Sequence, residues 1–204
     1  MNVRMLLVTN LMCFILIIPE INCFLYVEYH DQIDFTHVNI TRGAIQDVAA
    51  IHIASYLEPG KYDVVRQNAS EIIRLYFQKN PQAKDRYKIA VNEILQGLSM
   101  GERNVQQSPK YTMNNEQIEE GNRYLNEKRS LIVSLPIDDH QLLTAIRLQI
   151  GQFIFTLQDF YSNTNWIEIG GGVLNSLGWN DTLGFPVAQA NQSTCKDCTE
   201  PSAK

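Results

Sequence analysis

The 204-residue chain has little cysteine, no cluster of positive charge and few long apolar runs, and each shortage excludes a class of protein. Lys and Arg number 17 against 22 Asp and Glu, which gives a net charge of -5, and no basic run occurs. Nucleic acid is not expected as a partner, because phosphate binding depends on clustered Lys and Arg. Beyond the first residues no segment is apolar enough to span a bilayer, so no transmembrane span is expected once those residues are removed.

Cysteine is confined to the two ends of the chain. Cys13 and Cys23 lie in the first residues and Cys195 and Cys198 in the last, and no cysteine lies between them. A body of this size can be stabilised by its apolar core alone. The Cys195-x-x-Cys198 pair lacks the second pair that a zinc ribbon needs. In an oxidising compartment it is expected to form a local disulfide or to pair with cysteines beyond the end of this chain.

The first residues have the pattern of a secretory signal peptide, which we place at 1–23. One Arg precedes an apolar stretch of the length of a signal h-region, shorter than the roughly 20 residues of a spanning helix. Cleavage is expected after Cys23, which leaves a helical domain over 24–190 and a flexible tail over 191–204. A leader that stays uncleaved as a membrane anchor is the alternative.

N-x-S/T sequons fit the same secretory route. They stand at Asn39, Asn68, Asn180 and Asn191. Chance produces some such triplets, so they support the signal peptide without proving it. Together the leader and the sequons predict a secreted, extracellular glycoprotein.

Strand-like alternation and internal repeats are absent, whereas apolar residues recur at helical spacing along most of the chain. One helix is expected to begin with Thr41 as its N-cap. Another begins at Pro81, and Gly97 and Gly101 are expected to end it. These patterns predict an all-α fold, a multi-helix bundle.

The most apolar helix of the chain is expected to follow Asp138 or Asp139, either of which can be its N-cap. It is apolar on more than one side, and such helices usually lie at the centre of their fold. From Trp166 onward Gly and Asn are frequent, which predicts a loop-rich C-terminal segment.

The end of this helix reads GQFIFTLQDFYSNTNWIEIGG, residues 151 to 171. Phe155, Asp159 and Asn163 are four residues apart, so they fall on one face of a helix. A His-Asp-His ladder at that spacing would be part of a zinc site, because imidazole and carboxylate are common zinc ligands. Phenylalanine cannot bind zinc and an asparagine amide is a poor ligand for it. Of the three residues, only Asp159 can serve as a zinc ligand.

The stretch LQDFYSNTNWIEIG resembles the signature Leu-Gln-Asp-Phe-Tyr-Ser-His-Ser-Asn-Trp-x-Glu-Leu-Gly of a protein family. That family is the N-terminal region of von Willebrand factor A domain-containing protein 7 and its relatives, which is similar to the fungal heterokaryon-incompatibility Het-C family. FTHVNITRGAI, SPKYTMNNEQIEEGNRYLNEKRSLI and TCKDC resemble further blocks of it, so the resemblance extends from Phe35 to Cys198. It implies that this chain could be part of a longer protein with a von Willebrand factor A domain, whose Asp-x-Ser-x-Ser motif does not occur here.

The resemblance also implies a helical fold of the zinc-dependent phospholipase C and nuclease type, in which His and Asp from several helices hold metal ions. The positions of this chain that keep the family's residue are His37, Glu116, Asp159 and Glu168. The positions that differ are Thr112, Phe155 and Asn163, each in place of a histidine, and Asn114 in place of an aspartate. Zinc sites need three or four protein ligands. We therefore expect no catalytic residue, no metal and no other cofactor, with His37, Asp159 and Glu168 as vestigial candidates.

Two functions follow from these features. The first is a secreted, glycosylated helical domain without catalysis, an extracellular scaffold or interaction module for a protein partner. The alternative is a metal-dependent esterase, phospholipase or nuclease with a reduced site around the vestigial residues. Because a fold does not determine a function, we favour the first. Asp159 is then expected to be structural, with partners such as Trp166 or the following loop. His37 is expected to lie at the surface or to cap the first helix.

Overall fold

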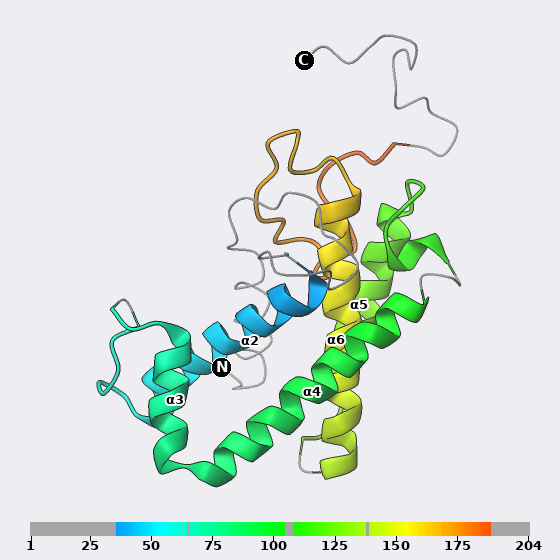
Figure 1. The fold of residues 1–204 in the computed structure, drawn as a ribbon. Coiled ribbons are helices and arrows are strands. Elements are labelled where there is room, and N and C mark those ends of the chain that lie inside the picture. The colour runs from blue at the N-terminus through cyan, green and yellow to red at the C-terminus, as the bar shows by residue number, and fades with distance from the viewer. Residues whose placement is uncertain (1–35, 65, 105–107, 138, 189–204) are drawn as a thin grey trace.

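The structure is a computed structural model that describes residues 36–64, 66–104, 108–137 and 139–188, and these residues form a bundle of helices (Figure 1). In chain order the α-helices are α2 (His37–His52), α3 (Ala69–Lys79), α4 (Pro81–Asn104), α5 (Ile118–Ser134) and α6 (His140–Asn163). A π-helical turn, η1 (Ile53–Leu57), continues α2, and a 3-10 turn, η2 (Pro109–Tyr111), precedes α5. No strand occurs in the described ranges, so the all-α prediction is confirmed.

Several predictions concern residues outside the described ranges. These are the signal peptide over 1–23, the tail over 191–204, and within that tail Asn191, Cys195 and Cys198. Among the residues that the structure describes, no helix is both long and apolar enough to cross a membrane. The segment from Thr164 to Ala188 contains turns and irregular chain without a helix, as its Gly and Asn content predicts.

The N-terminal ends of two helices agree with the sequence prediction and that of a third differs. Helix α4 begins at Pro81 as expected. Asp139 caps α6 as expected, because its carboxylate accepts a hydrogen bond of 2.7 Å from the backbone N–H of Gln141. The prediction that Thr41 caps the first helix was wrong. Thr36 is the N-cap, its hydroxyl accepting from the N–H of Asn39 at 3.2 Å. Thr41 lies inside α2 and is fully buried.

Helices α4 and α6 make the most extensive helix–helix contact, and their backbones touch where they cross (Figure 1). A Cβ atom added to Gly97 would lie 2.1 Å from the carbonyl oxygen of Leu148. A Cβ atom added to Gly151 would lie 2.0 Å from the carbonyl oxygen of Ile94. Both glycines are therefore required for the two helices to approach this closely.

The prediction that Gly97 and Gly101 end their helix was wrong, because α4 continues through both of them to Asn104. A glycine inside a helix costs about 0.5–1 kcal/mol relative to alanine, and tertiary packing offsets this cost. A Cβ atom at Gly101 would lie 2.9 Å from the Cβ of Phe155. This glycine therefore makes room for the Phe155 side chain on α6.

Helix α6 is the centre of the fold, as its composition predicts. Every residue from Gly151 to Phe160 is buried, and the helix contacts α2, α4 and α5. The main core is continuous around it, whereas a smaller apolar cluster joins α2, η1 and α3. The members of this second cluster are Ala50, Ile53, Ile72 and Ile73.

Polar side chains of α5 form hydrogen bonds with the loop after α6, at residues 178–180. Asn122 donates to the carbonyl of Asn180 at 2.8 Å and accepts from the N–H of Gly178 at 2.7 Å. Arg129 donates to the carbonyl of Gly178 at 2.9 Å, and its guanidinium lies 4.4 Å from the centre of the Trp179 ring. Because Asn122 is almost fully buried, these bonds fix a loop that has no helix of its own.

The close crossing predicts opposite effects for two substitutions of the same kind. Gly97→Ala should lower the free energy of unfolding by about 1–3 kcal/mol, because the new methyl group collides with the backbone of α6. Gly43→Ala is the control, since α2 has open space around Gly43. It should raise the free energy of unfolding by about 0.5–1 kcal/mol through helix propensity alone. Urea denaturation measures both, and equal effects would contradict the close crossing.

Candidate functional site

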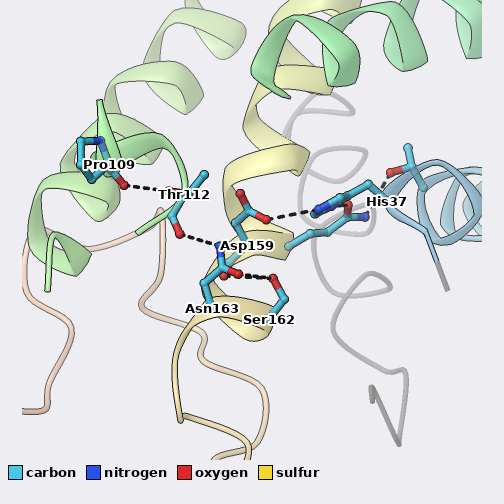
Figure 2. Close-up of polar contacts among 8 residues, drawn as sticks. His37, Pro109, Thr112, Asp159, Ser162 and Asn163 are labelled. Carbon is cyan, nitrogen blue, oxygen red and sulfur yellow. Dashed lines mark hydrogen bonds and ion pairs between the residues drawn. The ribbon is translucent and has the colours of Figure 1, made fainter. Parts of the chain in front are cut away.

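His37 and Asp159, both singled out by the sequence, form a buried pair between α2 and α6 (Figure 2). The His37 Nε2 lies 3.2 Å from the Asp159 Oδ1, and Asp159 is only 4% exposed. His37 stands in the first turn of α2 and faces α6, so the prediction of a capping or surface histidine was wrong. Asp159 is a partner of His37 and not of Trp166, whose Nε1 donates to the carbonyl of Gly172.

The second ring nitrogen of His37 is also bonded within the protein. Its Nδ1 lies 2.7 Å from the Oε1 of Gln158, and the amide of Gln158 donates to the hydroxyl of Thr41 at 3.1 Å. Both ring nitrogens therefore have hydrogen-bond partners within the protein, and a protonated ring would donate to both of them. The ring also lies against Phe155, with 4.9 Å between the ring centres.

The two charges of the pair alter each other's pKa. Burial alone would lower the pKa of His37, but its hydrogen bond to Asp159 and the charge of that carboxylate outweigh burial and raise the pKa above 6.5. Burial raises the pKa of Asp159, and the hydrogen bond to His37 only partly opposes this. The second oxygen of Asp159, Oδ2, has no hydrogen-bond partner among the described residues.

A second set of polar contacts lies one turn further along α6 (Figure 2). The amide of Asn163 donates to the carbonyl of Thr112 at 3.0 Å, and the hydroxyl of Ser162 donates to the Oδ1 of Asn163 at 3.2 Å. The hydroxyl of Thr112 donates to the carbonyl of Pro109 at 3.1 Å. Thr112 and Asn163, where the family resemblance implies histidines, therefore connect the chain before α5 to α6.

These residues do not fit a zinc ion. Both ring nitrogens of His37 are engaged by Asp159 and Gln158, the ring of Phe155 packs against His37, and the amide of Asn163 is bonded to backbone. The Oδ2 of Asp159 alone is uncommitted in the pair. Glu168 is exposed on the loop after α6 and takes no part in the contacts of the pair. In the described part of the chain, no three His, Cys, Asp or Glu are placed to hold a metal.

A hollow of about 530 Å³ at the end of α6 was not anticipated from the sequence. The buried side chains of Met113 and Phe160 line it, and Glu116 and Asn163 lie in its wall. Met113, Asn115 and Glu116 have positive φ angles of 54°, 55° and 61°. Non-glycine residues adopt this conformation at a cost, so no residue pattern of this segment predicts it.

The sequons of the described chain have exposed asparagines. Asn39 lies in the first turn of α2, Asn68 is the N-cap of α3, and Asn180 lies in the loop fastened to α5. Asn68 caps through its Oδ1, which accepts from the N–H of Glu71 at 2.8 Å. Its Nδ2, the atom that carries an N-linked glycan, is not needed for this bond.

Comparison with known proteins gives one family and one curated relative. The VWA7 N-terminal domain family model matches residues 67–204. The von Willebrand factor A domain-containing protein 7 of Homo sapiens is 26% identical over 181 residues, which cover 82% of this chain and 19% of that protein. The chain thus spans about a fifth of the length of this relative. No solved structure matches, so the likeness to the zinc-dependent phospholipase C fold stays a prediction.

The His37–Asp159 pair predicts a pH dependence of stability. Because the folded pKa of His37 lies above 6.5, the stability that it contributes is complete below pH 6.5 and is lost as the pH rises through the raised pKa. Asp159 acts in the same direction from pH 3.8 upward, because its folded pKa is raised as well. The free energy of unfolding should therefore fall as the pH rises above 6.5.

Denaturant titrations at a series of pH values test this expectation. His37→Gln removes the titrating ring, so the fall above pH 6.5 should shrink in this variant. Asp159→Asn keeps the ring but removes the charge that raises its pKa, so the window between pH 6.5 and the folded pKa narrows and the fall should shrink in this variant as well. A fall that is the same in the wild type and in His37→Gln would assign it to other groups.

Proposed function

The chain belongs to the VWA7 N-terminal domain family, and on that premise we propose that it is a secreted, glycosylated, non-catalytic domain that acts as an extracellular interaction module. The observation that carries this proposal is the state of His37, the one imidazole retained among the family's ligand positions. Both of its nitrogens have hydrogen-bond partners within the protein. A ring whose two nitrogens are both engaged in this way has no nitrogen open to a metal or to a proton from water.

The other substituted positions support the same proposal, because each has a structural use. Phe155 packs against the His37 ring, and Asn163 bonds to the carbonyl of Thr112. Reversing one of them would not supply a zinc site, since three or four ligands are needed at once. The site thus stabilises the contact of α6 with α2 and with the chain before α5.

The alternative, a metal-dependent esterase, phospholipase or nuclease, would use the Oδ2 of Asp159. This oxygen is buried and free of hydrogen bonds in the described part of the molecule. A single carboxylate oxygen does not lower the pKa of a bound water far enough for hydrolysis without further ligands to hold the metal. We therefore place this function second.

Metal analysis of the full chain, purified from a secretory expression host and mildly dialysed, tests catalysis. Zinc should be well below one per chain, and hydrolysis of lipid esters and nucleotides should be absent even with added zinc. Asp159→Ala should lower the free energy of unfolding by about 1–3 kcal/mol, because it leaves His37 without its buried partner. Glu168→Gln, at an exposed carboxylate, is the control and should change neither property. Stoichiometric zinc with hydrolysis that Asp159→Ala abolishes would overturn the proposal.

Secretion and glycosylation are tested by expressing the chain with its own leader in mammalian cells. The protein should appear in the medium beginning at Phe24 and should lose mass on treatment with an N-glycan amidase. Ser70→Ala removes the sequon of Asn68 without touching its N-cap bond, so one glycan should be lost with the stability retained. Thr182→Ala does the same for Asn180. Retention in the cell with no glycan would contradict this part of the proposal.

A further inference from the structure

Two hollows lie next to each other at the end of α6 and along α5. The first is the hollow of about 530 Å³ described above. The second has a volume of about 730 Å³ and lies between α5 and the C-terminal segment. Because Phe185 and Pro186 line both of them, the hollows are neighbours separated by this short stretch of chain.

The first hollow has a mixed lining of polar and apolar side chains, with an exposed apolar side chain at its edge. Met113, Phe160, Trp166 and Phe185 line it, and the Trp166 and Phe185 rings lie 4.7 Å apart. Ile169 stands at the edge and is 66% exposed. Beside these apolar side chains, Ile169 adds an exposed apolar surface that an apolar side chain of a partner could cover.

The charges that line the two hollows are mostly negative. Glu116 lines the first hollow, and Glu119, Arg123 and Asp181 line the second. The Arg123 guanidinium is already paired, 2.8 Å from the carboxylate of Glu120. Within the described ranges Glu116, Glu119 and Asp181 take part in no ion pair. An anionic ligand is therefore disfavoured, and a cationic one is favoured by charge complementarity.

The walls of the hollows are held in place before any partner binds. The left-handed backbone at Met113, Asn115 and Glu116 is fixed by the burial of Met113, whose side chain fits only because Gly121 has no Cβ. The bonds from Asn122 to the loop hold the stretch that leads into the second hollow. A surface ordered in this way loses little conformational entropy on binding.

We propose that the two hollows bind an extended basic segment of a partner protein. An apolar side chain of this segment enters the first hollow, and Lys or Arg side chains beside it lie near Glu116, Glu119 and Asp181. Two adjacent hollows suit an extended peptide, because its side chains at positions i and i+2 lie on one side, about 7 Å apart. This inference rests on the proposed function, since it names the kind of partner that an interaction module would bind.

Fluorescence anisotropy of labelled synthetic peptides on the full chain is the test. The probe is Gly-Lys-Gly-Leu-Gly-Lys-Gly, in which the leucine and both lysines lie on one side of the extended chain. It is compared with versions in which glutamate replaces both lysines or serine replaces the leucine. The lysine–leucine peptide should bind, the glutamate version should not, and the serine version should bind more weakly. Binding should weaken with added salt, and amide NMR shifts should concentrate at 113–118, 163–169 and 181–187.

Matched variants locate the site. Ile169→Ser should weaken binding about tenfold by removing an apolar contact, whereas Ile89→Ser, at a residue that is 54% exposed on α4 outside both hollows, should not. Glu116→Gln should weaken peptide binding about two- to fivefold, the effect of one exposed ion pair. Asp85→Asn is the control, because Asp85 lines neither hollow, and it should leave binding unchanged.

Absence of binding, equal binding of the glutamate peptide, or unchanged binding by Ile169→Ser would each overturn the inference. These outcomes are independent of the zinc and hydrolysis measurements, which report on catalysis alone.

Discussion

The contact of the α4 and α6 backbones at Gly97 and Gly151 determines where the parts of the site can lie. Each glycine allows the neighbouring helix to come within a distance that no side chain permits. The crossing fixes the rotation of α6 about its axis. It thereby determines which neighbouring element the side chains of Phe155, Asp159 and Asn163 contact. The Phe155 side chain fits beside Gly101, and the His37 ring of α2 then packs on Phe155. A change at the crossing would therefore displace the buried pair, although neither Gly97 nor Gly151 is a hydrogen-bond partner of the pair in the described part of the chain.

Polar residues in this fold connect elements that are far apart in the sequence. His37, Gln158 and Thr41 join α2 to α6, and Asn163 joins α6 to the chain before α5. Side chains that a hydrolase would direct at a metal and a substrate are here directed at each other and at backbone. Each such bond is worth about 1 kcal/mol, and leaving a partner unsatisfied costs more than that. The stability that these hydrogen bonds contribute is sufficient reason for polar residues to occupy the family's ligand positions.

The sequence predicts those features that local chemistry controls. Helical periodicity identifies the all-α class, the apolar run identifies α6 as central, and the cap of α6 is narrowed to Asp138 or Asp139. Prediction from the sequence fails where a tertiary contact outweighs local preference. A glycine usually indicates a helix end, so the sequence predicts that α4 ends near Gly97. The backbone of α6 that requires this glycine cannot be inferred from the residues of α4. The partner of Asp159 lies 122 positions away at His37, and no spacing rule links them. The left-handed backbone conformation at Met113 and Glu116 is equally unpredictable from the sequence, since neither methionine nor glutamate favours it.

The buried hydroxyl of Thr41 constrains the order of events during synthesis. Its partner Gln158 follows it by 117 residues, so α2 cannot dock on α6 until most of the chain has been made. Thr41 is also the third residue of the Asn39 sequon, and in the finished fold it is inaccessible. Under the proposal that Asn39 carries a glycan, the modifying enzyme would have to reach this threonine before α2 docks on α6.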